Sequence, residues 1–372
     1  MKIHFEPKEF SSKFKLAASV AAARDTKPIL QNVKAKADKK LGVILQATDT
    51  ELGIRIRVDC DVTNNGEAIL PTKRLTQILD LTREEKLTLE STDSNTVIGG
   101  ENENYDLNTQ SPDEFPDVEE FEETAYHEIP AKALKEMIRR TLFATDTDNV
   151  KYALGGVYFE MVDNNISVVA TDGRRLAWQE GSGNCVNDHK VETSILPART
   201  LQLLEKALSD HSIDEDEDVK MAVSANRVLF QCKDFTLFSR LVEGRFPKWR
   251  SIIPKTEDET PVVLESGSLL PATLQAQIMT SDLDPGVNFT FEKGKLTLQG
   301  QGKEIGNSKV EIPISFDGPK KTLKIDPKFM TSFLRVLDAD KVLSLYLPTD
   351  NDPFKVTVDD GGYVYVVMPM SS

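Results

Sequence analysis

The sequence is poor in the residues from which disulfides and metal sites are built. Among its 372 residues there are three cysteines and four histidines. The cysteines are odd in number, far apart and without CxxC spacing, and no histidines stand at a metal-ligand spacing. We therefore expect neither a disulfide framework nor a zinc site, and we predict no cofactor.

Long apolar segments are also missing. No apolar run approaches the length needed to cross a bilayer. The first ten residues, MKIHFEPKEF, lack the apolar core of a secretory signal. The sequence therefore predicts a cytoplasmic protein with no membrane partner.

Familiar catalytic motifs are absent too. There is no GxxxxGK phosphate loop, no GxSxG elbow and no HExxH zinc motif, so no catalytic residues are predicted. Asp146 and Asp148 in ATDTDN could form a cation loop, but a turn at the end of a helix is the simpler interpretation. Asp172 could act as an acid or base, but a turn between two strands also explains it.

What the chain does contain is one segment in three versions. LPARTLQLLEKAL, Leu196–Leu208, is matched by LPTKRLTQILDL from residue 70 and IDPKFMTSFLRVL from residue 325. Each has proline near a helix start and apolar residues at i and i+3, which mark one buried face. A basic residue stands two places before the first apolar anchor: Lys73, Arg199 and Lys328. The copies lie about 126 to 129 residues apart, the difference between these numbers, which indicates a whole domain repeated.

Three copies predict three domains of similar size, which we place at 1–124, 125–256 and 257–372. The first boundary falls in Ser111–Thr124, which has seven acids, two prolines and no base. Strands outnumber helices and many connections are short, which favours antiparallel meanders over βαβ crossovers. The predicted fold class is α+β, each domain having antiparallel sheets with two helices on one face.

The first helix of each domain is predicted over 7–21, 131–143 and 270–280. The third contains Pro271, which a helix tolerates in its first turn. Two short echoes support the copying. The tripeptide ATD occurs at 47 and again at 170, and the dipeptide FP occurs at 115 and again at 246.

The charge pattern bears on possible partners. A formal charge of −15 taken alone favours a protein with no nucleic-acid role. The acids, however, concentrate in loops at 113–123 and 214–218, whereas helix 131–143 carries four bases against one acid. Helices that bury one face expose the other, so we expect a basic surface that holds phosphates without sequence preference. Ordinary solvated helix faces are the alternative.

Three separated motifs carry a resemblance to a known family. ATDGRRLAW (170–178), LVEGRFPKWRSIIP (241–254) and YVVMPM (365–370) look like the bacterial DNA polymerase sliding clamp, the beta subunit of the polymerase III holoenzyme. The resemblance runs the full length of the chain. It implies a non-catalytic processivity factor, a head-to-tail homodimer closed into a ring of six similar domains. Such a ring encircles double-stranded DNA independently of sequence and tethers the replicative polymerase, the clamp loader and other proteins through a short peptide.

The resemblance also implies three sets of site residues. A peptide-binding pocket between the second and third domains would comprise Leu154, Thr171, Gly173, Arg174, Arg175, Leu176, Pro247, Ile252, Val366, Met368, Pro369 and Met370. The subunit interface would include Arg74, Tyr105, Leu107, Ile278 and Met279. The bases expected to face DNA are Arg24, Lys73, Lys132, Arg139, Arg199 and Lys328.

Two other functions compete with this one. Asp49 and Asp172 could be the paired carboxylates of a hydrolase, although the third domain has no aspartate in its matching turn. The chain could also be an adaptor that binds only proteins and never meets DNA.

Overall fold

The computed structural model describes residues 1–22, 27–92, 95–146, 148, 153–189, 191, 193–210, 213–256, 259–348, 352–358 and 362–370. The chain divides into two compact units. Unit 1 comprises Met1–Lys132, Gly183–Val191 and Arg199–Leu241, and unit 2 comprises Ala133–Ser182, Glu192–Ala198 and Val242–Ser372. None of the helices in the described part combines the length and the apolarity that crossing a bilayer requires.

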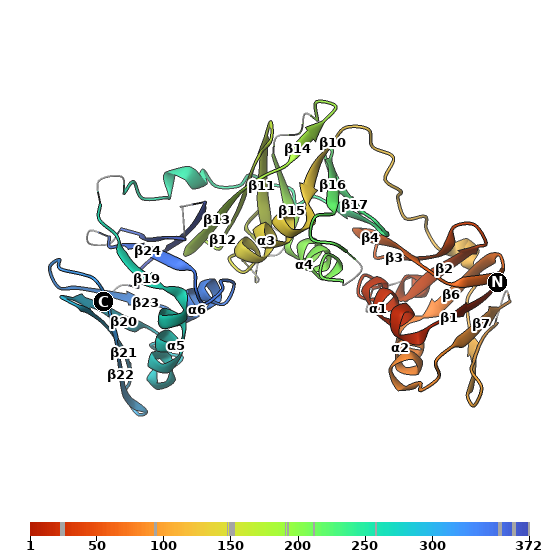
Figure 1. Ribbon diagram of the computed structural model, residues 1–372, viewed down its shortest axis with the longest axis horizontal. Coiled ribbons are helices and arrows are strands. Elements are labelled where there is room, and N and C mark those ends of the chain that lie inside the picture. Colours follow the sequence, from red (N-terminus) through yellow and green to blue (C-terminus); the bar gives the residue numbers. More distant parts are fainter. Residues whose placement is uncertain are drawn as a thin grey trace. The chain divides into compact units, whose positions relative to one another are not determined.

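One order of elements occurs three times along the chain, with one strand fewer in the third copy (Figure 1). The first repeat contains β1 (Lys2–Phe5), α1 (Pro7–Ala18), η1 (Pro28–Gln31), β2 (Asn32–Asp38), β3 (Gly42–Thr48), β4 (Leu52–Val58), β5 (Asp61–Asn64), β6 (Gly66–Pro71), α2 (Thr72–Leu81), β7 (Leu87–Ser91), β8 (Asn95–Gly99) and β9 (Asn104–Asn108). The short helix η2 (Pro112–Glu114) follows.

The second repeat contains β10 (Tyr126–Pro130), α3 (Ala131–Leu142), η3 (Ala153–Gly155), β11 (Gly156–Val162), β12 (Asn165–Thr171), β13 (Arg175–Ser182), β14 (Asn184–Val186), β15 (Thr193–Pro197), α4 (Ala198–Ala207), β16 (Asp218–Val223), β17 (Arg227–Cys232) and β18 (Phe235–Arg240). After η4 (Trp249–Ser251), the third contains β19 (Val262–Glu265), α5 (Ser266–Ala276), η5 (Gln277–Met279), β20 (Val287–Glu292), β21 (Lys295–Gly302), β22 (Gly306–Pro313), β23 (Lys321–Ile325), α6 (Pro327–Leu334), β24 (Val342–Tyr346), β25 (Phe354–Val358) and β26 (Tyr363–Val367). The predicted threefold α+β repeat is confirmed.

Unit 1 is built on two sheets. One has five strands in the order β5-β1-β7-β8-β9, and the other has nine in the order β14-β10-β16-β17-β18-β4-β3-β2-β6. The nine-stranded sheet joins two repeats because β4 pairs with β18, with Ile54 opposite Leu237. Helices α1 and α2 lie side by side (Figure 1), and α1 packs on β2, β3 and β4.

Unit 2 follows the same plan. Its eight-stranded sheet has the order β15-β11-β12-β13-β26-β25-β24-β19, and its four-stranded sheet has the order β22-β21-β20-β23. Here β13 pairs with β26, and Leu176 lies opposite Val366. Helices α5 and α6 lie side by side, and α5 packs on β21 and β22. Every strand pairing in the described part is antiparallel, as predicted.

The repeated helices form for the reason that their spacing suggested. Their apolar anchors are buried: Leu75, Ile78, Leu201, Leu204, Met330 and Phe333. The matched bases are each the second residue of a helix, α2, α4 and α6. Burying one large side chain contributes roughly 1.5–3 kcal/mol, so two anchors fix each helix on its sheet.

Two helix predictions were wrong in detail. Helix α1 ends at Ala18 rather than at residue 21, because Ser19 closes it with N–H bonds to Lys15 and Leu16 and a hydroxyl bond to Leu16. Helix α5 begins at Ser266, so Pro271 lies inside the helix and not in its first turn. Its ring nitrogen cannot donate to the carbonyl of Gly267, which costs the helix one bond.

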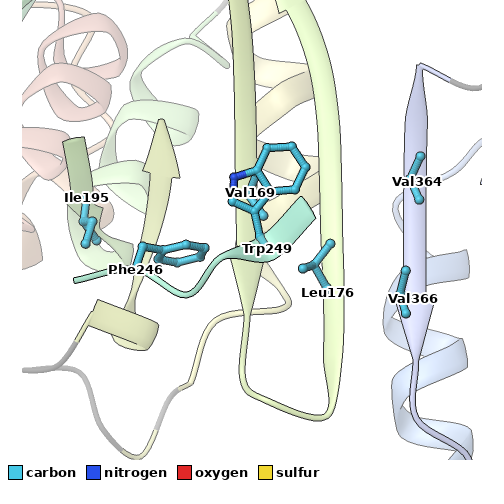
Figure 2. Close-up of a cluster of buried hydrophobic side chains, with 7 residues drawn as sticks. All are labelled: Val169, Leu176, Ile195, Phe246, Trp249, Val364 and Val366. Carbon is cyan, nitrogen blue, oxygen red and sulfur yellow. The ribbon is translucent and has the colours of Figure 1, made fainter. Parts of the chain in front are cut away.

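Two connecting segments bury side chains in clusters with residues of the large sheets, and we name them by their composition. The acidic strap, residues 113–123, buries Phe115 and Val118. The aromatic strap, residues 243–253, buries Phe246 and Trp249 in the cluster of Figure 2, with Val169, Leu176, Ile195, Val364 and Val366. The FP echo in the sequence is thus a repeated anchor.

Both straps have buried apolar anchors and ion pairs, but in different proportions. In the aromatic strap the ring centroids of Phe246 and Trp249 lie 4.9 and 5.0 Å from those of Tyr158 and Trp178. In the acidic strap, Arg55 pairs with a glutamate, and Arg227 pairs with two. The aromatic strap has one ion pair among the described residues, Arg250 with Glu160, whereas the acidic strap has three, so salt should screen the hold on the acidic strap more.

Candidate functional site

The ATD echo forms one kind of turn in both repeats. After β12, the Thr171 hydroxyl donates to the Arg175 carbonyl (2.6 Å) and accepts from the Gly173 N–H (3.1 Å). After β3, the Thr48 hydroxyl likewise donates to the Leu52 carbonyl (2.9 Å) and accepts from the Thr50 N–H (2.9 Å). Thr50 has φ 76° and Gly173 has φ 85°, so the third position of each turn is left-handed.

The two aspartates that suggested a hydrolase complete these turns. One oxygen of Asp172 accepts the N–H groups of Arg174 and Arg175 at 2.9 and 3.0 Å. Asp49 does the same for Glu51 and Leu52 at 3.1 and 2.8 Å. The second oxygens pair with arginines, Arg175 and Arg199 respectively. Both carboxylates thus have structural roles, which leaves the hydrolase hypothesis without a free pair.

Asp146 also lies in a turn. Its carboxylate accepts the N–H of Asp148 at 2.9 Å, and its own N–H donates to the Leu154 carbonyl at 2.8 Å. Across the described residues, no three side chains of histidine, cysteine, aspartate or glutamate gather closely enough to hold a metal ion. These contacts favour the turn interpretation over a cation loop.

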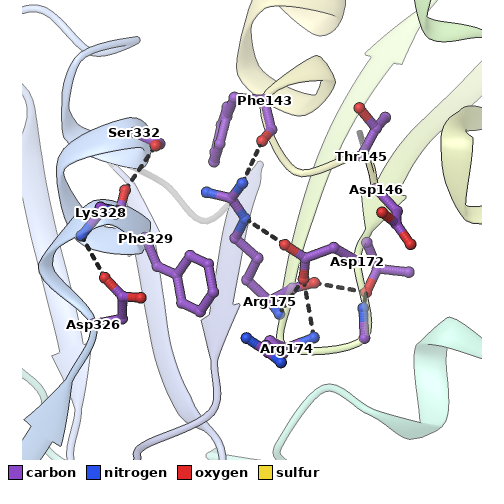
Figure 3. Close-up of polar contacts among 12 residues, drawn as sticks. Phe143, Thr145, Asp146, Asp172, Arg174, Arg175, Asp326, Lys328, Phe329 and Ser332 are labelled. Atoms are coloured by element: carbon purple, nitrogen blue, oxygen red, sulfur yellow. Dashed lines mark hydrogen bonds and ion pairs between the residues drawn. The ribbon is translucent and has the colours of Figure 1, made fainter. Parts of the chain in front are cut away.

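The side chain of Arg175 points inward (Figure 3). Its Nε lies 3.0 Å from Asp172 Oδ2, and its Nη2 donates to the Phe143 carbonyl at 2.7 Å. The guanidinium lies 5.4 and 4.8 Å from the ring centroids of Phe143 and Phe329. With side chains only 12% and 16% exposed, Arg175 and Asp172 form a mostly buried pair. Arg175 therefore joins the turn, the end of α3 and α6, and it acts as a positioning residue.

Many of the residues expected in the peptide pocket come together in unit 2. Leu176 and Val366 share the buried cluster of Figure 2, and Pro247 lies between its members Phe246 and Trp249. The Met368 N–H donates to the Arg174 carbonyl at 2.8 Å, which holds the C-terminal segment against the turn. Residues with exposed side chains stand at this surface: Arg174, Ile252 and Met368.

Two other predicted pocket residues lie at its margins. Leu154 is tied to Asp146 by the backbone bond given above. The Met370 N–H donates to the Lys324 carbonyl at 2.7 Å, and its sulfur lies beside Gly286. Met370 therefore packs toward the four-stranded sheet. Pro369 lies between Met368 and Met370, and the surface as a whole is an apolar floor with an exposed arginine at its edge.

The residues expected at the subunit interface lie beside two sheet edges. Tyr105 and Leu107 lie on β9, the edge strand of the five-stranded sheet. Ile278 and Met279 lie in η5, which contacts β21 and the edge strand β22, and Ile278 is 67% exposed. Arg74, on α2, lines a cavity of about 700 Å³ together with the end of β9.

Of the bases expected to face DNA, Arg24 lies outside the described residues. The others are all exposed: Lys73, Lys132, Arg139, Arg199 and Lys328. Lys132 pairs with Glu215, and Arg199 pairs with Asp49. For the remaining three, the described part of the chain contains no ion pair, so their full charge is available to a ligand.

Counting helix bases in the sequence overstated the basic surface. Arg140 on α3 bonds to Gln179 at 2.9 Å and lies 5.2 Å from the Tyr363 ring centroid. Lys13 on α1 is 8% exposed and lies 3.6 Å from Asp234. The side chains of Arg140 and Lys13 therefore make contacts within the fold and do not add to the basic surface. Helical periodicity alone did not predict this.

Comparisons with known proteins agree along the whole chain. The models of the N-terminal, central and C-terminal domains of the DNA polymerase III beta subunit match residues 1–119, 128–248 and 250–371. The beta sliding clamp of Halalkalibacterium halodurans is 28% identical over 359 residues, which cover 90% of this chain and 92% of that protein.

Solved structures show the same fold. A sliding clamp from Pseudomonas aeruginosa bound to griselimycin superposes with a TM-score of 0.91 at 24% identity and full coverage of both chains. A putative DNA polymerase III beta subunit from Eubacterium rectale gives a TM-score of 0.87 at 25% identity, again with full coverage of both. Since three family models in chain order match nearly all of the sequence, the chain belongs to the DNA polymerase III beta subunit family, the bacterial sliding clamps.

Proposed function

We propose that the chain performs the processivity function of its family as a closed, non-catalytic ring of two copies that encircles duplex DNA in the cytoplasm and slides along it. The observation that carries this proposal is the threefold repeat of one domain, with an exposed base at the second position of α2, α4 and α6. Matched positions on matched helices favour a common ligand. A sequence-independent polyanion fits diffuse positive charge.

The sheets supply a rule for closing the ring. Strand β4, which ends the first group of strands in repeat one, pairs with β18, the last strand of repeat two. Strand β13 pairs with β26 in the corresponding way. The same rule would pair β22 of one copy with β9 of another, and both are edge strands among the described strands. Two such head-to-tail junctions close a ring of two copies.

The ring is tested by retention on DNA. The wild-type chain, loaded by a clamp loader, should stay on nicked circular DNA through gel filtration and be lost once the circle is cut. Equal loss from circular and linear DNA would contradict encirclement. It would leave the adaptor that binds only proteins as the surviving hypothesis.

The subunit interface has its own test. Changing Ile278 and Met279 together to alanine should shift the sedimenting species toward single chains, because the exposed Ile278 and the half-buried Met279 would no longer offer apolar surface to be buried in the dimer. An unchanged dimer would remove these residues from the interface. A wild-type chain that sediments as a monomer at micromolar concentration would exclude the ring itself.

We further propose that the apolar surface around Leu176, Val366 and Met368 binds the short peptide through which polymerases and the clamp loader attach. Burying a leucine-sized group contributes roughly 1.5–3 kcal/mol, and ordering the peptide opposes it, so affinity should be micromolar, near roughly −8 kcal/mol. Truncation after Val367 should abolish peptide binding in calorimetry and leave the dimer intact. Equal affinity after truncation would place the peptide elsewhere.

A further inference from the structure

The third repeat lacks one strand that the first two possess. Strand β1 is flanked on one side by β7 and on the other by β5, and β10 is flanked by β16 and β14 in the same way. The equivalent strand β19 pairs with β24 on one side only. Among the described strands none occupies its outer edge, so the eight-stranded sheet ends in an open row of backbone groups.

The connecting segment explains the missing strand. In the first two repeats the chain between β4 and β6, or between β13 and β15, turns aside to form β5 or β14. In the third repeat the segment after β22 bonds instead to the β20–β21 turn. The Ile314 N–H donates to the Gly294 carbonyl (3.1 Å), and the Gly294 N–H donates to the Phe316 carbonyl (3.0 Å). Because these bonds hold the segment at the β20–β21 turn, it does not pair with β19.

Apolar side chains next to this edge are exposed to solvent, as is typical of a surface that a partner covers. Val263 on β19 is 47% exposed and Val342 on β24 is 42% exposed. Val342 lies opposite Glu265, itself exposed, and the described residues contain no ion pair of Glu265. A strand laid along β19 would cover apolar surface and meet one negative charge.

We propose that the outer edge of β19, Val262–Glu265, binds an extended basic segment of a partner protein as an added antiparallel strand. Main-chain hydrogen bonds would supply the affinity, and alternate side chains would supply the selectivity. This surface lies at the edge of the sheet, whereas the β13–β26 junction lies at its centre, so the inference does not depend on the proposed peptide pocket.

The internal repeats define what the segment should look like. Ile3 of β1 faces Val62 of β5, and His127 of β10 faces Cys185 of β14. Val262 is the equivalent residue of β19, since each stands four places before the first residue of its helix. The bound segment should therefore place a small apolar residue opposite Val262. Antiparallel counting puts a base opposite Glu265 three residues earlier, giving the pattern base-x-x-small apolar.

Charge selects a partner protein over a second copy of the chain. Each copy carries a formal charge of −15, and its residues 259–265 contain no base that an antiparallel second copy could place opposite Glu265. A basic segment instead gains a cross-strand pair with Glu265 and is attracted by the whole molecule.

The test uses a fluorescein-labelled synthetic peptide containing Lys-Thr-Thr-Val within a threonine-rich extended stretch. Anisotropy should show binding to the full-length chain, and hydrogen exchange should slow at residues 262–265. Two further peptides carry N-methyl groups on alternate residues, in one phase or the other. An added strand bonds through alternate amides only, so one phase should abolish binding and the other should preserve it.

Reversing the charge of Glu265 tests its predicted pairing with the basic residue of the peptide. Glu265→Lys should weaken binding about 3- to 10-fold, and a peptide with Glu in place of the lysine should then bind better than the original. Glu85→Lys reverses another exposed charge, in the loop before β7, and should change nothing. The proposal is overturned if wild-type binding is absent, if both N-methyl phases bind alike, or if the unliganded chain forms an assembly that Glu265→Lys dissolves.

Discussion

Arg175→Met should destabilise unit 2 by about 3 kcal/mol. The change removes the partner of Asp172 Oδ2 and the donor to the Phe143 carbonyl from a mostly buried place. Breaking a buried ion pair costs about 3–5 kcal/mol because one charge stays behind unpaired. Asp172 keeps two backbone N–H donors on its other oxygen, so we expect the lower end of this range.

Tryptophan fluorescence can measure this loss selectively. The chain has two tryptophans, Trp178 and Trp249, and both lie in unit 2 with ring centroids 5.0 Å apart. With an m-value of about 3 kcal/mol/M, the urea midpoint should fall by about 1 M. Arg174→Met is the control. Arg174 is exposed, so its replacement should stay within about 0.5 kcal/mol of wild type.

The reasoning would be refuted by either of two results. One is an Arg175→Met midpoint equal to that of the wild type. The other is an equal drop for Arg174→Met, which would mean that removing any charge from this turn matters and that the buried contacts do not. Arg175→Lys should fall between the wild type and Arg175→Met, because lysine keeps the charge but lacks the planar fork that reaches two acceptors.

Three further outcomes are expected. Reversing Lys73, Arg139 and Lys328 to glutamate should lower the slope of log affinity for duplex DNA against log salt by about 0.9 for each phosphate that is no longer neutralised, and an unchanged slope in an anisotropy titration would show that these bases do not meet DNA. Burial, and after it nearby carboxylates, raise the pKa of the Cys60 and Cys232 thiols from 9.0 to about 12, so iodoacetamide at pH 8 should label neither thiol in the folded chain, and rapid labelling seen by mass spectrometry would contradict the raised pKa. Between pH 9 and 12 these thiols lose protons in the unfolded chain but keep them in the folded chain, so the free energy of unfolding should fall as pH rises. Raising NaCl from 0.1 to 1 M should speed hydrogen exchange more in the acidic strap, which has three ion pairs among the described residues, than in the aromatic strap, which has one, and equal responses would mean that ion pairs do not hold the acidic strap.

The local spacing of apolar residues in the sequence predicted most of the fold. The anchors Leu201 and Leu204 and their counterparts are spaced by the helix itself, so the sequence predicts both the helix and its buried face. Pro271 was misplaced because the helix start depends on Ser266 and Gly267, whose N–H groups bond to the carbonyls of Lys341 and Ala339. Bonds between residues so distant in sequence leave no local pattern.

The sequence predicted which residues gather at the site better than it predicted the directions of their side chains. The resemblance brought Thr171–Leu176 and Val366 together, and the strand pairing does the same. It gave no sign that the Arg175 side chain turns inward, because direction depends on Phe143 and Phe329 from other elements. Nor could it tell that Arg140 serves the interior while its neighbour Arg139 remains exposed.

The pairing of β4 with β18 and of β13 with β26 has a consequence for anyone dividing the gene into fragments. A fragment cut at the linker near residue 124 would keep β4 and lose β18, leaving a seven-residue strand with half its backbone groups unpaired. Such a bare edge recruits other chains, so the fragment should precipitate or form adventitious oligomers. A cut after Leu241 would preserve the nine-stranded sheet but would remove β26 from the eight-residue strand β13, so it would move the bare edge to the second large sheet instead of abolishing it.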